Sequence, residues 1–553
     1  MAHRAILGWF LLLATVGAQD ANASGGRLLP EQAAIDVRHY DLALTVDPQA
    51  KTISGACTMT ARALTSVERV ALHLDQRLTV SSVVVGERQV PFTHADGLVR
   101  VTLPGPVAEG GEVAVTIAYG GAPRVAPNPP WKGGFTWKET RDGQPWIATS
   151  CQGEGADLWW PCKDHPSDKP ETFDLHITVP RGLVCASNGT LRKVERVKGG
   201  RRFHWHVANP ISNYCVALNI APYTVLKTTF VSVDGTRVPV EFYALPRNEA
   251  KAKKFLPEVL DHLKQMEEIC GPYPFRNEKY GVAETPHLGM EHQTIIAYGN
   301  KYRVRQAFNY DWLHHHEMSH EWWGNLVTCK DWRDMWIHEG IGTYMQALYL
   351  ESRRGPEAYA VQMTKKRRTL RNSRPIAPRA SQDSKQIYFN PKGGFDNDLY
   401  DKGSWVMHTL RWVLGDKQFF KALRRMAYPD PKLEKVTDGS QGRFATTEGL
   451  RAIAEEHHGE DLRWFFDLYV RQPALPELVV KKDGGRLQLA WKTPGDVEFP
   501  MPVPVKLGKK IVRVPMPGGK ATVALKGRVY EVDPNHRLLK VEPRRPGRRG
   551  RRR

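Results

Sequence analysis

The stretch FNYDWLHHHEMSHEWWGNLVTCKDWRDMWIHEGIGTYMQALY, residues 308–349, decides both the fold and the chemistry of this chain. Within it, His316, Glu317 and His320 spell H-E-x-x-H in a segment that we predict to be helical from about residue 310 to residue 327. Histidines four residues apart lie on one face of a helix, so their ring nitrogens can converge on one metal ion at about 2.1 Å. The glutamate between them can then reach a water molecule on that ion.

A third metal ligand is predicted on a second helix. Eighteen residues separate His320 from Glu339, which lies in WIHEGIGTYMQALYLE after the loop TCKDWRDM. A helix, a short return and a second helix can bring this carboxylate to the two imidazoles and leave one coordination position open, which is typical of a catalytic zinc site. Cobalt or manganese would also accept these ligands, and we predict one zinc ion per chain. The adjacent His314 and His315 lack this spacing, so we expect them to be solvated or structural residues.

Around this segment, the apolar and polar patterns divide the 553 residues into three folded parts of a multidomain α+β protein. Residues 27–235 alternate in short steps, as in YDLALTV and FDLHITVP, which predicts a large antiparallel β domain. Residues 236–472 change to helical spacing, as in KKFLPEVLDHLKQMEEI, which predicts a mixed and mainly helical domain around the metal site. Residues 473–540 return to strands between Gly-Gly and Asp-Pro breakers, which predicts a small β-sandwich.

The first 23 residues are typical of a secretory signal peptide. Arg4 precedes an apolar run at residues 6–16, and small residues follow around Ala18 and Ala23, either of which could mark the cleavage site. The apolar run is far shorter than the ~20 residues needed to cross a bilayer. We therefore expect export to the periplasm or the extracellular space, with no membrane span after signal removal.

The formal net charge of +20 is concentrated at the end of the chain, where RRPGRRGRRR carries seven arginines and leaves +13 for the rest. Such a patch could bind nucleic acid or an anionic membrane, but it has no aromatic residues between the charges and no folded context. We predict a basic, disordered tail at residues 541–553 and expect no nucleic-acid partner.

The seven cysteines are scattered and lack the paired spacing of a zinc knuckle. An oxidising compartment would permit disulfides, with Cys151 and Cys162, or Cys185 and Cys215, as candidate pairs. Spacing alone leaves the connectivity open.

The metal-site motifs resemble those of the gluzincin family of aminopeptidase N and leukotriene hydrolase. The resemblance rests on H-E-x-x-H, the eighteen-residue gap to Glu339, WGN at residues 323–325 and WIHEG at residues 336–340. It covers nearly the whole mature chain and implies a β-saddle domain, a thermolysin-like catalytic domain and a β-sandwich, as in a short, bacterial-type member without the family's C-terminal helical domain. His338 stands where family members usually carry Asn.

Two further motifs resemble family motifs that take part in the reaction. Tyr400-Asp401-Lys402-Gly403 resembles the family's Y-x-K-G motif, which implies that Tyr400 donates a hydrogen bond to the developing oxyanion. The segment LGMEH resembles the exopeptidase motif G-x-M-E-N, with Leu for the first Gly and His for Asn. It implies that four residues bind substrate, with Glu291 against the free amine: Gly289, Met290, Glu291 and His292.

The β domain is expected to complete the amine site. TSCQGEG, residues 149–155, resembles the family segment whose Gln or Glu contacts the substrate amine, and Gln152 falls on that position. If this segment is extended, Glu154 lies on the same face and would be a second contributor.

Together these features predict a zinc-dependent aminopeptidase that acts on peptides with a free N-terminus, with Glu317 as general base. A thermolysin-type endopeptidase would use the same metal ligands but has no need of Glu291, whereas epoxide hydrolysis on the same fold stays open as an alternative. From a different class, an inactive peptide-binding scaffold would not need the intact base, ligands and Tyr400. The sequence does not indicate an oligomeric state or a preferred N-terminal side chain.

Overall fold

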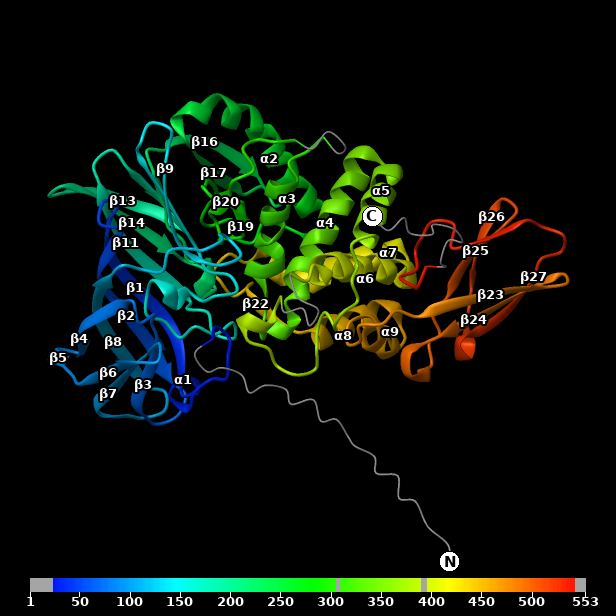
Figure 1. The fold of residues 1–553 in the computed structure, drawn as a ribbon, viewed down its shortest axis with the longest axis horizontal. Coiled ribbons are helices and arrows are strands. Elements are labelled where there is room, and N and C mark those ends of the chain that lie inside the picture. Colours follow the sequence, from blue (N-terminus) through cyan, green and yellow to red (C-terminus); the bar gives the residue numbers. More distant parts are fainter. Residues whose placement is uncertain (1–22, 305–308, 389–394, 543–553) are drawn as a thin grey trace, which may run out of the picture.

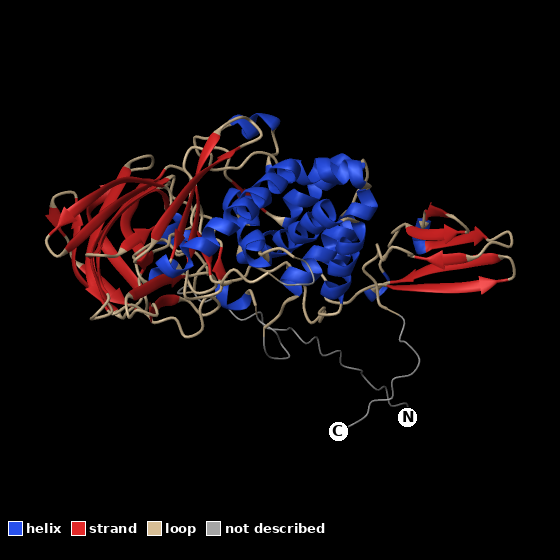
Figure 2. Cartoon of the chain, turned by 90° about the horizontal axis from the view of Figure 1, so that it is seen from above, coloured by secondary structure: helices blue, strands red, loops and turns tan. Residues whose placement is uncertain are grey.

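The structure, a computed structural model, describes residues 23–304, 309–388 and 395–542. These residues form a β-rich N-terminal domain, a largely helical middle domain and a small β-rich C-terminal part, arranged along the long axis of the molecule (Figure 1). Seen from above, the helices lie between the two groups of strands (Figure 2). The predicted signal peptide, apart from Ala23, and the arginines of the predicted tail lie outside the described residues.

The N-terminal domain is built on an eight-stranded sheet in the order β13-β14-β11-β1-β2-β8-β4-β5. Buried and more exposed positions alternate along β11 because one face of the sheet packs on the core. The strands run mainly antiparallel, as predicted, but β1 and β11 pair in parallel. The strand bounds are β1 Ile35–Asp47, β2 Thr52–Ala63, β4 Leu78–Val85, β5 Arg88–Gln89, β8 Glu112–Gly121, β11 Thr172–Pro180, β13 Thr190–Val197 and β14 Gly200–Val207.

Two smaller sheets and one short helix complete this domain, and the sheets have the orders β3-β7-β6 and β12-β15-β10-β9. β10 leads directly into the segment that carries Gln152, so the four-stranded sheet places this residue at the domain border. The bounds are α1 Pro30–Ala33, β3 Val67–His73, β6 Phe92–Ala95, β7 Leu98–Val107, β9 Gly134–Glu139, β10 Pro145–Ser150, β12 Val184–Ala186 and β15 Asn219–Ala221.

The middle domain combines a mixed five-stranded sheet, in the order β16-β17-β18-β20-β19, with a group of helices. The predicted boundary at residues 235/236 falls in the turn between β16 and β17, which pair with each other. β17 continues into this sheet through parallel pairing with β18, so the domain's sheet begins at Thr224. The strand bounds of this sheet are β16 Thr224–Val231, β17 Arg237–Ala244, β18 Tyr280–Glu284, β19 Gly289–Met290 and β20 Ile296–Tyr298. A separate two-stranded sheet pairs β21 Val327–Cys329 with β22 Arg443–Ala445.

In the middle domain, His316 lies on α3, His320 directly follows α3, and Glu339 lies on α4, against which α6 packs (Figure 1). The bounds of the helices are α2 Glu249–Cys270, α3 Trp312–Ser319, α4 Trp336–Arg354, α5 Pro356–Arg367, α6 Asp398–Leu414, α7 Asp416–Ala427, α8 Thr447–His458 and α9 Arg463–Tyr469. Within the described residues, no helix combines the length and apolar character needed to cross a membrane.

The C-terminal part contains two three-stranded sheets, β23-β24-β27 and β26-β25-β28, which agrees with the predicted sandwich. The bounds of these strands are β23 Glu477–Asp483, β24 Arg486–Lys492, β25 Val503–Leu507, β26 Lys510–Val514, β27 Lys520–Ala524 and β28 Tyr530–Val532.

All seven cysteines of the chain are buried and unpaired, so neither candidate disulfide is formed.

Candidate metal centre and substrate cavity

Helix α3 positions the first two predicted ligands, and it is shorter than the sequence predicts. Asp311 caps its N-terminus by accepting hydrogen bonds from two backbone amides at 3.1 Å. The α-helix ends at Ser319 and a six-residue π-helical segment follows, in which Trp323 and Gly324 leave helical geometry. This break turns the Trp323 carbonyl toward His320, whose Nδ1 lies 2.9 Å from it. A proton on Nδ1 therefore leaves Nε2 of His320 free to bind a metal.

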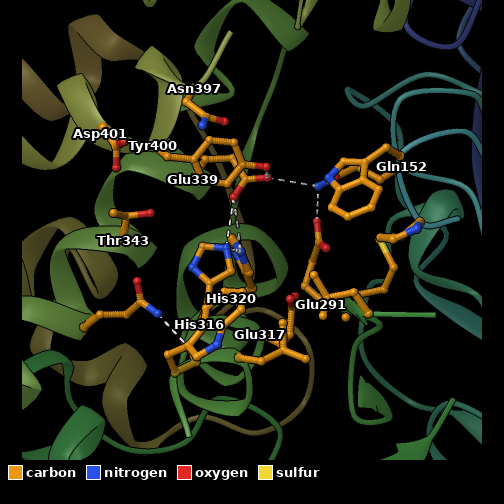
Figure 3. Close-up of a pocket in the computed structure, with 18 of the residues that line it drawn as sticks. Gln152, Glu291, His316, Glu317, His320, Glu339, Thr343, Asn397, Tyr400 and Asp401 are labelled. Carbon is orange, nitrogen blue, oxygen red and sulfur yellow. Dashed lines mark hydrogen bonds and ion pairs between the residues drawn. The ribbon is translucent and has the colours of Figure 1, made fainter. Parts of the chain in front are cut away.

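His316, His320 and Glu339 converge as the spacing predicted (Figure 3). The two Nε2 atoms lie 3.3 Å apart, and Glu339 Oε2 lies 3.3 Å from that of His316 and 3.5 Å from that of His320. Among the described residues, this is the one group of three such donors whose ligand atoms all lie within 4.8 Å of one another. Glu339 Oε2 is buried without a hydrogen-bond partner. A cation bound by all three atoms would satisfy it.

The charges of the site also fit a cation. Glu317 is buried, which raises the pKa of its carboxyl well above the usual value, and the neighbouring carboxylates add to this rise. Burial would lower the pKa of His320, but Glu339, Glu291 and Glu317 together raise it to about 10. Three carboxylates thus lie close to two imidazoles in a largely buried site, and a divalent ion offsets the repulsion between the carboxylates.

Close contact between α4 and α6 brings Tyr400 to the metal ligand. A Cβ atom on Gly340 would lie 2.8 Å from Cα of Gly403, so both helices need glycine where they touch. This contact places Tyr400 Oη 2.9 Å from Glu339 Oε1. Lys402 of the same motif points away from the site and donates to the Gln472 and Pro473 carbonyls at 2.9 and 3.0 Å, so it anchors α6 to the following chain.

The predicted amine site lies beside the metal ligands. Glu291 follows β19, is 2% exposed, and accepts hydrogen bonds from Gln152 and, at 3.0 Å, from Tyr214 Oη. Gln152 Nε2 also lies 3.4 Å from Glu339 Oε1, so one amide bridges the predicted anchor and the third ligand (Figure 3). Gly289 lies against the predicted base, because a Cβ there would come within 2.3 Å of Glu317 Oε1.

Tyr388 is a site residue that sequence reasoning missed. Its Oη lies 3.1 Å from Glu339 Oε1, 3.3 Å from Gln152 Oε1 and 3.3 Å from Tyr400 Oη. It therefore links the metal ligand, the amine site and the predicted oxyanion donor. No motif surrounds this residue, and eleven residues separate it from Tyr400, so only the fold reveals its place.

Other predicted residues lie elsewhere. His292 does not line the cavity: its ring is fully buried, and neither ring nitrogen has a hydrogen-bond partner. Its predicted contact with substrate is therefore not supported. Glu154 forms an ion pair with Arg124 and is not part of the cavity lining.

The histidines beside the metal ligands are structural, which is one of the two roles that the sequence predicts for them. His314 is buried and its Nε2 lies 2.8 Å from Tyr280 Oη, while His315 Nε2 lies 3.1 Å from Gln265 Oε1. His338, which departs from the family pattern, accepts a hydrogen bond from the Cys329 amide at 2.8 Å. These rings hold the helices in place and leave metal binding to the other three residues.

A cavity of about 350 Å³ opens onto the metal ligands. Besides the ligands, its lining includes Gln152, Glu291, Glu317, Tyr400 and, from α5, Gln362 and Lys366. Met290 and Gly289 also line it, as predicted. A space of this size admits a short stretch of peptide and no folded protein.

Comparison with known proteins agrees with this architecture. The peptidase M1 N-terminal domain matches residues 37–215 and the peptidase family M1 domain matches residues 273–467. The chain belongs to peptidase family M1. This confirms the family resemblance, and the family and the three convergent donors together make zinc the metal of this site.

Individual relatives give the extent of the likeness. Aminopeptidase M1-B from Oryza sativa subsp. japonica is 27% identical over 371 residues, covering 62% of this chain and 39% of that protein. Leukotriene A-4 hydrolase from Xenopus laevis is 27% identical over 344 residues, covering 56% and 51%. The chain thus spans about half or less of these two relatives.

A solved structure matches more completely. An M1 zinc metallopeptidase mutant from Deinococcus radiodurans, bound to a Tyr-Ser-Ala substrate, has a TM-score of 0.66 and 25% identity over 83% of this chain and 98% of that one. The multidomain fold predicted from the sequence is confirmed by this match.

Proposed function

We propose that this protein is a zinc aminopeptidase that removes the N-terminal residue from short peptides. One observation carries the proposal: the side-chain amide of Gln152 contacts both the buried carboxylate of Glu291 and the metal ligand Glu339. The two carboxylates are therefore only one amide group apart. A substrate ammonium paired with Glu291 would therefore place the first peptide bond beside the metal. An enzyme that cuts within a chain has no use for such an anchor.

The residues divide the reaction between them. His316, His320 and Glu339 would hold zinc, which supplies a Lewis acid that polarises the peptide carbonyl and acidifies a water molecule. Glu317 takes a proton from the attacking water and delivers it to the leaving nitrogen. Tyr400 donates a hydrogen bond to the carbonyl oxygen as negative charge develops on it.

The experiment compares aminoacyl amide reporters with their N-acetylated counterparts. A Glu291→Ala variant should lose about 10²-fold in kcat/KM on the free amines, since an unpaired buried charge costs ~3 kcal/mol, and should lose little on blocked substrates. Glu154→Ala is the matched control, because that carboxylate is paired with Arg124 outside the cavity. Equal losses on free and blocked substrates would remove the anchor and favour an endopeptidase.

We also propose that the chain is exported, on the evidence of its first 23 residues. Fractionation of the producing cells, with N-terminal sequencing of the recovered protein, tests this. An uncleaved N-terminus in the cytoplasmic fraction would contradict it.

A further inference from the structure

A row of charged and imidazole side chains crosses four neighbouring strands of the large N-terminal sheet. Asp41 lies on β1, His176 on β11, His204 on β14 and Glu195 on β13, and these strands are consecutive in the sheet. His176 and His204 stand directly opposite each other in the antiparallel β11–β14 pair. The two side chains are 28% and 22% exposed, so this is the face of the sheet that water reaches.

The two imidazoles face each other through nitrogen atoms. His176 Nδ1 lies 2.8 Å from His204 Nδ1, with the ring centres 4.7 Å apart. At the far edges of the rings, Asp41 Oδ1 lies 3.4 Å from His176 Nε2, and Glu195 Oε2 lies 3.3 Å from His204 Nε2. Since an ionised carboxylate can only accept, each Nε2 facing one is expected to carry the ring proton.

This arrangement leaves a place for a cation. With both protons on the Nε2 atoms, the two Nδ1 atoms are both acceptors 2.8 Å apart, and they repel unless they share a proton or a metal ion lies beside them. A carboxylate on the far nitrogen of each ring is also the arrangement that orients histidine ligands in metal sites and raises their basicity. The row thus contains two candidate histidine ligands and, on the far side of each ring, a carboxylate that can orient it.

We propose that His176 and His204 bind a second metal ion, a divalent transition-metal ion such as Zn²⁺, on this exposed sheet face. Imidazole nitrogen suits zinc, copper and nickel and is a poor ligand for magnesium or calcium. Two protein ligands leave the other coordination positions to water, so this ion binds more weakly than the ion held by His316, His320 and Glu339. The site joins β11 to β14 and, through the flanking carboxylates, β1 to β13.

The surroundings of the row favour a cation on balance. Asp174, two residues before His176 on the same face, lies 2.7 Å from His206 Nδ1 and 3.6 Å from His39 Nε2. Lys193 and Arg202 are the opposing charges: Lys193 Nζ lies 3.6 Å from Glu195 Oε1, and Arg202 stands opposite Glu195 and donates to Thr178 Oγ1 at 3.0 Å. Three carboxylates therefore face two cationic side chains near the imidazole pair.

Metal content tests the proposal without reference to peptidase activity. The full chain is stripped with a chelator and equilibrated by dialysis against buffered Zn²⁺, and bound zinc is counted per chain. The wild type should take up two ions, and the His176→Ala/His204→Ala double variant should take up one, with unchanged peptidase activity. A His94→Ala variant, which removes an imidazole bonded to the Leu74 carbonyl outside the row, should keep two.

Two further variants sharpen the outcome. Asp41→Asn with Glu195→Gln keeps both rings and should weaken the second ion about 10- to 100-fold, because the carboxylates orient the ligands. His316→Ala with His320→Ala should leave one ion, held by the sheet. One ion in the wild type would mean that the pair holds only a proton, and two ions in the His176/His204 variant would place the second ion elsewhere; either result overturns the proposal.

Discussion

The contact between α4 and α6 allows a sharp test of how the site is positioned. In Gly340→Ala, the new methyl group would lie 2.8 Å from Cα of Gly403 and 2.9 Å from the Leu399 carbonyl oxygen. Both obstacles are backbone atoms, so the helices must separate by about 0.6 Å to reach the 3.4 Å at which ordinary contact begins. Such a shift would carry Tyr400 Oη, now 2.9 Å from Glu339 Oε1, to the limit of hydrogen bonding.

The expected result follows from these distances. Overpacking of this kind costs about 1–3 kcal/mol of unfolding free energy. Because a misplacement of ~1 Å near the reacting groups can cost 10²-fold, we expect a 10- to 100-fold loss of kcat on aminoacyl amides. Denaturant unfolding and steady-state kinetics measure the two effects. Gly449→Ala in α8 is the matched control, since its Cβ would meet only Thr446 Oγ1 at 3.5 Å. Wild-type stability and turnover in Gly340→Ala would refute the close-contact argument.

Three further substitutions test separate parts of the site. Glu317→Gln should keep its bound zinc, measured by metal analysis, and lose at least about 10²-fold in kcat because the proton acceptor is gone; normal turnover would exclude Glu317 as the base. Tyr400→Phe should lower kcat about 10²- to 10³-fold with little change in KM, and a change confined to KM would make it a binding residue. Burial lowers the pKa of His292 to about 3. Between pH 6.5 and 3, the unfolded state therefore takes up a proton at this residue that the folded state does not, and the free energy of unfolding falls as the pH falls. His292→Asn should reduce that fall, by up to about 1.4 kcal/mol per pH unit, and parallel curves of unfolding free energy against pH would contradict it.

The metal ligands could be predicted because their geometry is local. His316 and His320 are four residues apart, and His320 keeps helical backbone angles as the C-cap of α3, so their spacing alone brings the two rings together. Glu339 followed from the eighteen-residue gap, since two helices joined by a short loop must pack against each other. The break at Trp323 and Gly324 was not predictable, because no local pattern shows that the Trp323 carbonyl is needed by His320.

The amine site was predicted less completely because it joins distant segments. Gln152 and Glu291 meet across the border of two domains, and only the family resemblance brought them together. Tyr388 carries no motif, so its place between Glu339 and Tyr400 depends on tertiary packing alone. His292 is the reverse case: the motif predicted that it contacts substrate, but its side chain is buried in the core.

The neutral amide at Gln152 has a reason in the charge balance of the site. Glu291, Glu317 and Glu339 together bring three negative charges to a buried cavity. A zinc ion and a substrate ammonium would bring three positive charges, so the loaded site is neutral when all three carboxylates are ionised. A carboxylate at position 152, in contact with both Glu291 and Glu339, would add an unpaired buried charge and raise the cost of folding without substrate. The amide donates to both carboxylates, and under the proposed function a substrate ammonium would replace it at Glu291.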